Sequence, residues 1–369
     1  MMNVKTFKGG VIMRFFNKVF FLSVLITFSS CSDLSSCSPA NKDNRKNLIY
    51  IIGDGMGFNH IENTKTYLGK KSFFFENYYT GSVATHSADQ NITDSAAAAT
   101  ALATGVKTNN KYLGVNPNCK KLQNIMELSN SLNRKTGIIT TDSLWGATPA
   151  GFSAHHNTRD EIQPILDDQS VSNIDLLFGL HNTTYQDQKQ KFINNGYNYL
   201  ETLEELNSAS KENKIIGNFK NINSKYNTEI NNPISLKELV TYSLDYFSSF
   251  DSAFTLMVEG AYVDKHSHSN NLLLMLYAMQ DLYDATEYIF DWASKNMDTV
   301  IIFTADHETG GLKKANSKEE LTNDLYTSVS HTASNVPLYL YNAEFNSSEI
   351  DNTDIFKIAK DIVINHSTK

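Results

Sequence analysis

Four stretches of this chain share one pattern, in which a β-rich apolar run ends in polar residues. Apolar runs without alternation are typical of strands that are buried on both faces, as in parallel sheets. Helical patterns lie between them, at 121–133, 233–250 and 271–296. This alternation predicts an α/β fold, a three-layer sandwich with a central, mostly parallel sheet flanked by helices. The four stretches are NLIYIIGDGMG (47–57), TGIITTDSLWGATPA (136–150), AFTLMVEGAYVDKHSH (253–268) and TVIIFTADHETGG (299–311).

Residues able to carry chemistry follow these apolar runs. Because ligands of open parallel sheets bind at the carboxyl ends of the strands, we expect these side chains to gather at one edge. Such a density of charge cannot be buried unpaired, and divalent metal ions would resolve it. Mixed imidazole and carboxylate ligands suit zinc, whereas oxygen ligands alone suit magnesium, and the set is too large for one ion. It comprises Asp54, Glu259, Asp264, His268, Asp306, His307 and, a little later in the chain, His331.

The stretch TDSAAAATALATG (93–105) places one serine before four alanines. We interpret Ser95 as a nucleophile at the start of a helix, where the helix dipole adds positive potential. The alanines would let the start of this helix lie close to other groups.

Each motif alone also has an ordinary structural interpretation. GDGMG suits a strand-to-turn connection, DKHSH a solvated loop, TADHETGG a turn after a strand, the alanines a close-packed core helix, and His331 a surface or core histidine. The coincidence of these motifs at the ends of four strands favours a catalytic site.

The order of the motifs resembles that of the alkaline phosphatase family. The matching segments are GDGMG, TDSAAAATALATGVKT, ATPAGFSAH with a following arginine, VEGAYVDKHSH, TADHETGG and HTASNVP, which together span residues 47 to about 341. The resemblance implies a phosphomonoesterase that releases inorganic phosphate from small phosphate monoesters through a phosphoserine intermediate on Ser95.

The resemblance also implies a role for each site residue. Arg159 would grip two phosphate oxygens, and Lys265 occupies a variable family position near the phosphate. Two zinc ions and a third ion, magnesium in most of the family, would be bound. One zinc would be held by Asp264, His268 and His331, the second by Asp54, Asp306 and His307 with Ser95 reaching the same ion, and the third ion by Asp54, Thr148 and Glu259.

The chain departs from the family pattern at Gly146, where many members carry Asp or His near the third ion, so the identity of that ion stays open. In members that have both, this acid pairs with the lysine at the position of Lys265. Lys265 is therefore expected here without that partner and closer to the phosphate. For Arg159 the ordinary alternative is a surface ion pair with Asp160 or Glu161.

Two other functions remain open at this point. One is a phosphodiesterase or sulfatase-like hydrolase on the same fold, and the other is a non-catalytic surface protein that binds metal or phosphate. The net charge of −8 and the lack of a basic–aromatic stripe argue against nucleic acid as a partner. The segment between TADHETGG and His331 lacks the long insertion that many relatives use in dimer contacts, so a monomer and a homodimer both stay open.

The N-terminus predicts export. Basic residues precede the apolar run VFFLSVLITF (19–28), which is shorter than a membrane span and has the length of a signal-peptide core. Small residues before Cys31 favour a lipoprotein-type signal peptide (1–30) and a lipid on Cys31, in a periplasmic or cell-surface protein anchored to a bacterial membrane. An ordinary secreted protein and an uncleaved anchor are the alternatives, and Met13 is an alternative start.

The remaining boundaries follow from composition. Residues 31–46 are expected to form a polar tether, and 47–369 the catalytic domain with a peripheral helical insertion at about 181–232. The sequence leaves open whether Cys37 and Cys119 pair.

Overall fold

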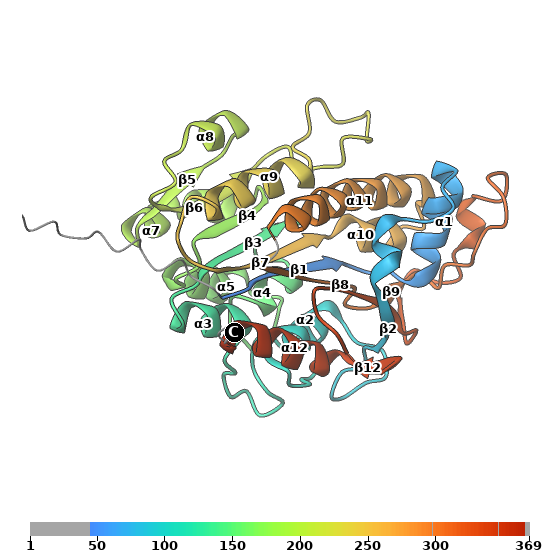
Figure 1. The fold of residues 1–369 in the computed structure, drawn as a ribbon, viewed down its shortest axis with the longest axis horizontal. Coiled ribbons are helices and arrows are strands. Elements are labelled where there is room, and N and C mark those ends of the chain that lie inside the picture. Colours follow the sequence, from blue (N-terminus) through green and yellow to red (C-terminus); the bar gives the residue numbers. More distant parts are fainter. Residues whose placement is uncertain (1–44, 297, 346, 366–369) are drawn as a thin grey trace, which may run out of the picture. The chain divides into compact units, whose positions relative to one another are not determined.

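Ten strands form the central sheet of the computed structural model, which describes residues 45–296, 298–345 and 347–365 (Figure 1). They are β1 (Asn47–Gly53), β2 (Tyr79–Ala84), β3 (Lys135–Thr140), β4 (Leu176–Leu180), β5 (Tyr197–Leu200), β6 (Lys214–Phe219), β7 (Phe254–Gly260), β8 (Thr299–Thr304), β11 (Val336–Tyr341) and β12 (Glu349–Asp351). Their order across the sheet is β12-β2-β11-β8-β1-β7-β3-β4-β6-β5. Only β11 runs antiparallel to its neighbours, β2 and β8, so the predicted mostly parallel sheet is confirmed.

The four strands predicted from the apolar runs are neighbours at the centre of this sheet, in the order β8-β1-β7-β3. Residues 48–52 of β1 have no exposed surface, because helices cover both faces of the sheet. The parallel register places Ile52 opposite Glu259 on one side and Thr304 on the other. The carboxyl ends of these strands therefore meet at one edge.

Helices cover the two faces of the sheet (Figure 1). One face carries α2 (Ser95–Thr104), α3 (Ile125–Ser131), α4 (Ala147–Gly151), α5 (Ile162–Val171) and α12 (Asn352–Ile364). The other face carries α1 (Phe58–Leu68), α9 (Leu236–Phe247), α10 (Tyr262–His268) and α11 (Leu272–Lys295). The three-layer sandwich is thus as predicted. The 3₁₀ helices are η1 (Phe74–Tyr78) and η2 (Asn323–Leu325), and a two-stranded ribbon pairs β9 (Glu308–Thr309) with β10 (His331–Thr332).

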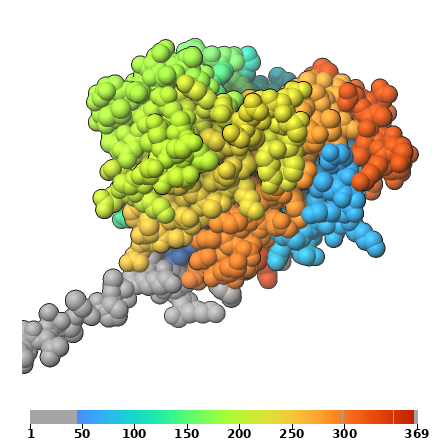
Figure 2. Space-filling view, turned by 90° about the horizontal axis from the view of Figure 1, so that it is seen from above, coloured from blue at the N-terminus to red at the C-terminus, as the bar shows by residue number. Residues whose placement is uncertain are grey.

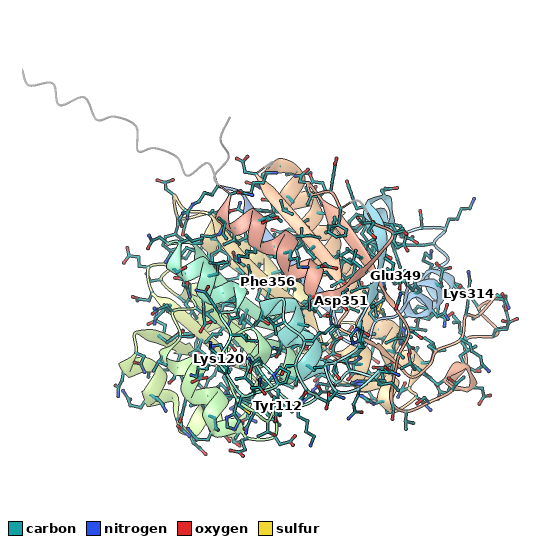
Figure 3. The ribbon with its side chains drawn as sticks, turned by 90° about the horizontal axis from the view of Figure 1, so that it is seen from below. Tyr112, Lys120, Lys314, Glu349, Asp351 and Phe356 are labelled. Atoms are coloured by element: carbon teal, nitrogen blue, oxygen red, sulfur yellow. The ribbon has the colours of Figure 1, made fainter. Side chains whose placement is uncertain are left out.

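The alanine-rich helix α2 is buried along its whole length. A Cβ atom at Gly151 of α4 would lie 2.7 Å from the Cβ of Ala99, so neither helix could carry a larger side chain at this crossing. On the outer side, α12 packs across α2, with Phe356 facing the end of α2 and Asp351 capping the start of α12 (Figure 3). The close packing predicted for the alanines is therefore confirmed.

The segment 181–232 differs from its prediction. It contains the short helices α6 (Thr183–Asp187), α7 (Lys189–Asn194) and α8 (Leu203–Ser208), but also β5 and β6, which extend the sheet at its edge. The purely helical prediction was wrong because β6, with the sequence KIIGNF, is short and includes a lysine and an asparagine, so it does not stand out as an apolar run. Figure 2 shows the residues of this part, in green to yellow, at one end of the face that it draws, and α1, in blue, at the other end.

The predicted signal peptide, most of the tether, Cys31 and Cys37 lie outside the described residues and stay predictions. Cys119 is exposed and has no disulfide partner among the described residues, so its pairing with Cys37 stays open. Within the described ranges, we find no helix with the length and apolar character needed to cross a bilayer.

Candidate metal centre

The ends of the central strands position most of the predicted site residues. Asp54 directly follows β1, Glu259 is the penultimate residue of β7, and Asp306 and His307 come two and three residues after β8. Helix α10 starts two residues after β7 and carries Asp264 and His268. The β9–β10 ribbon places His331 opposite Thr309, which explains how a histidine far along the chain reaches this edge.

Asp54, Asp306 and His307 form what we call the inner cluster. The Nε2 atom of His307 lies 3.1 Å from Oδ2 of Asp306 and 3.5 Å from Oδ1 of Asp54. Asp306 and His307 have no exposed surface, and Asp54 is 7% exposed. Ligand atoms of all three residues lie within 4.8 Å of one another, close enough to hold one ion. The backbone holds the other carboxylate oxygen of Asp306, because the N–H groups of Gly55 and His307 both donate to Oδ1, at 3.1 and 2.9 Å.

Gly55 is required by the turn that follows β1. Its φ angle is +73°, and a Cβ atom there would lie 2.8 Å from Cα of Asp264. Because a side chain at Gly55 is excluded by both conformation and space, the middle glycine of GDGMG lets the two halves of the centre approach.

Asp264, His268 and His331 form the outer cluster. The Nε2 atoms of the two histidines lie 3.1 Å apart, and they are 3.3 Å and 3.6 Å from Oδ1 of Asp264. Each Nδ1 atom faces a backbone carbonyl, that of Val329 at 2.6 Å for His268 and that of Thr93 at 2.9 Å for His331. A carbonyl can only accept, so in the neutral rings the proton lies on Nδ1 and both Nε2 lone pairs point into the cluster. Two facing lone pairs are suited to a shared cation.

Ser95 adjoins the inner cluster. Its Oγ atom is 3.0 Å from Nε2 of His307, and the residue begins α2, as predicted. The preceding residue, Asp94, caps the helix by accepting from the N–H of Ala97 at 3.0 Å.

Arg159 lies beside this helix start. Its Nη1 donates to Oδ2 of Asp94 at 3.3 Å, while Asp160 pairs with Lys111 and Glu161 lies 3.5 Å from His156. Among the described residues, Arg159 therefore pairs with neither Asp160 nor Glu161, and its guanidinium contacts the residue that precedes Ser95.

Glu259 lies close enough to Asp54 for its charge to raise the pKa of that residue, and Thr148 lies near Glu259. The hydroxyl of Thr140 donates to Oε2 of Glu259, and burial, followed by the charge of Asp142, raises the pKa of Glu259 to about 7. The Thr148 side chain lies close enough to Glu259 to lower the pKa of this carboxyl. All potential ligand atoms here are oxygens.

The structure corrects the prediction for Lys265. Its Nζ atom lies 2.5 Å from Oδ1 of Asp142, so the lysine is paired and not free to lie closer to the phosphate. The prediction failed because it considered only the position of Gly146. The acid is supplied four residues earlier, in the loop after β3.

The residues present fit metal ions. Three buried oxygens of this centre form no hydrogen bond of normal geometry with the described residues, namely Oδ1 of Asp54, Oδ2 of Asp306 and Oγ1 of Thr148. Burial, together with the charges of Asp306, Asp264 and Glu259, raises the pKa of Asp54 well above its usual range. Burial and the adjacent His307 lower the pKa of His331 to about 4, which keeps this imidazole neutral and able to bind a cation at pH 7. A cation would satisfy these oxygens and offset their charge.

Some contributors were not predicted from the sequence. Thr309 donates to Oδ1 of Asp264 at 2.5 Å and lies 3.2 Å from Nδ1 of His307, so it links the two clusters. Its place in TADHETGG, two residues after His307, could have indicated this contact. The carbonyls of Thr93 and Val329 leave no such signal, because every residue type has one. The roles of the site residues as ligands, nucleophile or phosphate-binding groups stay predictions.

Known proteins resemble this chain over most of its length. The family model described as alkaline phosphatase matches residues 45–179 and 175–360. Alkaline phosphatase 4 of Bacillus subtilis (strain 168) is 33% identical over 301 residues, and alkaline phosphatase 3 of the same organism is 30% identical over 292 residues. These matches cover 76% and 73% of this chain, and 65% and 63% of the two relatives, so the chain spans somewhat less than two thirds of their length.

A solved structure agrees with the sequence comparison. The alkaline phosphatase from the Antarctic bacterium TAB5 superposes with a TM-score of 0.74 at 27% identity, over 87% of this chain and 98% of that chain. The fold, the family model and the clustered acids and histidines agree, and the chain therefore belongs to the alkaline phosphatase family.

Proposed function

We propose that this protein is a metal-dependent phosphomonoesterase that hydrolyses phosphate monoesters to an alcohol and inorganic phosphate, with a phosphoserine intermediate on Ser95. The observation that carries the proposal is the position of the Ser95 hydroxyl. It lies 3.0 Å from His307 of the inner cluster, at the start of a buried helix whose capping residue, Asp94, contacts the guanidinium of Arg159. Family membership and the names of the Bacillus relatives support the same activity.

In the first step, Oγ of Ser95 forms a bond to phosphorus, and the bond from phosphorus to the ester oxygen breaks. The alcohol departs and phosphoserine remains. In the second step, water forms the new bond to phosphorus, the serine oxygen leaves, and phosphate and the free hydroxyl are regenerated. The ten-residue helix α2 directs its positive N-terminal end toward the anion in both steps.

Arg159 would bind the substrate by its phosphate. Its planar guanidinium can donate to two non-bridging oxygens at once, and the contact of Nη1 with Asp94 orients it. A monoester has three non-bridging oxygens and a diester has two, so only a monoester can give two oxygens to Arg159 and keep a third for another group of the site. We therefore expect this contact to favour monoesters.

The residues also define where metal ions would bind. The outer cluster, Asp264, His268 and His331, would hold one zinc ion, the inner cluster would hold a second with Ser95 adjacent, and Asp54, Thr148 and Glu259 would hold magnesium. When bound, these ions supply Lewis acidity that lowers the pKa of nearby hydroxyl and water groups and neutralises developing charge. A variant of the TAB5 enzyme has been solved with bound Mg, which supports the third ion.

A hydrolysis assay tests the proposal. We expect release of phosphate from p-nitrophenyl phosphate, loss of this activity after chelation, and recovery when zinc and magnesium are added back singly and then together. Faster cleavage of the bis-ester or of a sulfate ester would overturn the monoester assignment. Tight binding of zinc or phosphate without any turnover would overturn the assignment as an enzyme.

We also propose that the chain acts outside the cytoplasm, anchored through a lipid on Cys31, with small phosphate esters as substrates. The apolar run before Cys31 supports this location. Metabolic labelling with a fatty acid should tag the wild-type chain and not C31A. Equal labelling of both would contradict the anchor.

A further inference from the structure

Asp142 is an acid next to the proposed magnesium site that neither the family resemblance nor the comparisons assign. It follows β3 by two residues, and in the sheet register Thr140 of β3 lies opposite Glu259 of β7. The hydroxyl of Thr140 accepts from the backbone N–H of Asp142 at 2.8 Å and donates to Glu259. One hydroxyl thus connects Asp142 with Glu259.

The Asp142 carboxylate occupies the space that a side chain at position 146 would need. A Cβ atom built at Gly146 would lie 2.6 Å from Oδ2 of Asp142 and 3.0 Å from its Cγ. Hence no side chain at position 146 can coexist with Asp142 in this position, and the glycine and the acid depend on each other.

The two oxygens of Asp142 have different environments. Oδ1 accepts from Nζ of Lys265 at 2.5 Å and from the N–H of Ser143 at 2.7 Å. Within the described residues, Oδ2 accepts no hydrogen bond, and its side chain is 22% exposed. The lysine and the backbone therefore hold one oxygen and leave the other available.

A second observation points to a ligand at this place. Oδ1 of Asp54, on a residue that is 7% exposed, has no hydrogen-bond partner among the described residues, and the hydroxyl of Thr148, which is 1% exposed and near enough to lower the pKa of Glu259, forms no hydrogen bond of normal geometry. A buried oxygen without a partner is costly, and a cation between Thr148, Glu259 and Asp54 would satisfy both atoms.

We propose that Asp142 is a positioning residue of the third cation site, where its free oxygen orients the waters of a magnesium ion held by Asp54, Thr148 and Glu259. This rests on the proposed function for the presence of that ion. Mg²⁺ retains several waters when it binds to protein, so an acid just outside its ligands can fix their orientation. Lys265 offsets the extra negative charge and keeps the carboxylate in place.

Titration of the purified full chain, loaded with zinc, tests the role by a readout other than activity. Mg²⁺ alone is the probe, measured by calorimetry, with zinc and magnesium per chain measured by elemental analysis. D142A and the nearly isosteric D142N should weaken Mg²⁺ binding about 10- to 100-fold, while zinc stays at the wild-type amount. The second variant keeps the test valid if D142A does not fold.

A positional exchange provides the matched control. In D142A/G146D the Asp142 carboxylate no longer blocks a side chain at position 146, and only the Ser143 carbonyl, 3.0 Å from the new Cβ, must shift by a few tenths of an ångström. This variant should recover most of the Mg²⁺ affinity lost in D142A, which a merely structural role for Asp142 would not give. Wild-type Mg²⁺ affinity in D142N, or equal loss of zinc and magnesium in both single variants, would overturn the proposal.

The test separates this inference from the proposed function. An active phosphatase whose Mg²⁺ affinity does not depend on Asp142 would refute only the role of Asp142. A chain that binds Mg²⁺ through Asp142 but hydrolyses no phosphate ester would refute only the activity.

Discussion

The inner and outer clusters contain the same kinds of residue but are built differently. The inner cluster extends from strands at the centre of the sheet, and Asp306 and His307 have no exposed surface. The outer cluster stands on the short helix α10 and the β9–β10 ribbon, and the side chain of His268 is 42% exposed. The groups that orient the side chains also differ. Backbone N–H groups hold Asp306, whereas two backbone carbonyls from separate loops hold His268 and His331.

This difference indicates a division of labour. Side chains on buried strands cannot move without disturbing the core, so the inner cluster provides a fixed site beside Ser95. If the outer cluster binds a cation, we expect that cation to exchange more readily, because the side chain of His268 is 42% exposed. The following tests examine this difference between the inner and outer clusters.

The largest expected effect is that of S95A. Removing the Ser95 hydroxyl should lower turnover by about 10³-fold or more, because the proposed nucleophile is then missing. Zinc content should stay near that of the wild type. Mass spectrometry after acid quenching should detect phosphoprotein in the wild type alone, and phosphorylated S95A would disprove the assigned nucleophile.

D306N and H268A compare the two clusters directly. D306N removes the nearer of the two carboxylates that face the fully buried His307, so we expect loss of one zinc ion and destabilisation of about 3 kcal/mol. H268A should lose one zinc ion as well but cost about 1 kcal/mol or less, since its side chain is partly in solvent. Urea unfolding and elemental analysis measure both. Equal destabilisation by the two variants would remove the contrast in rigidity.

Metal removal should proceed in two phases. With a chelator in excess, we expect the ion of the more exposed outer cluster to leave about tenfold faster than that of the inner cluster, because the inner ligands must open the core to release it. Zinc released over time can be followed with a chromogenic chelator. H268A should lack the fast phase. A single phase in the wild type would show that burial does not control exchange.

The last test concerns a buried acid outside both clusters, whose effect depends on pH. Asp281 of α11 is 3% exposed, and its Oδ2 accepts from the N–H of Leu236 at 3.2 Å. Burial raises its pKa to about 7, with Asp284 and Glu238 adding to the rise and Lys225 opposing it. The folded chain therefore binds a proton that the unfolded chain has released, and stability should fall as pH rises from about 4 to about 7.

D281N removes this pH dependence while keeping the oxygen that accepts from Leu236. At 1.4 kcal/mol per pKa unit, the difference between variant and wild type has a ceiling of about 4 kcal/mol at pH 8 and should vanish near pH 4. Urea unfolding of both proteins at equal metal content measures it. A difference in unfolding free energy that stays constant at all pH values would indicate a packing effect instead of a raised pKa of Asp281.

Much of the site could be predicted from the sequence because parallel strands end at a common edge. Apolar runs that stop at Asp54, Glu259 and Asp306 are enough to place those acids together, and the order of the motifs indicates the family. The start of α2 at Ser95 likewise follows from local signals, an aspartate cap before a run of alanines.

Only the tertiary structure decided which groups meet across space. The pairing of Lys265 with Asp142, the carbonyls that orient His268 and His331, and the place of β5 and β6 in the sheet depend on segments far apart in the chain. Local periodicity reports which residues are buried along one element, but not which loop reaches the same point from another strand. For that reason the acid at Asp142 became visible only when its carboxylate was found in the space beside Gly146.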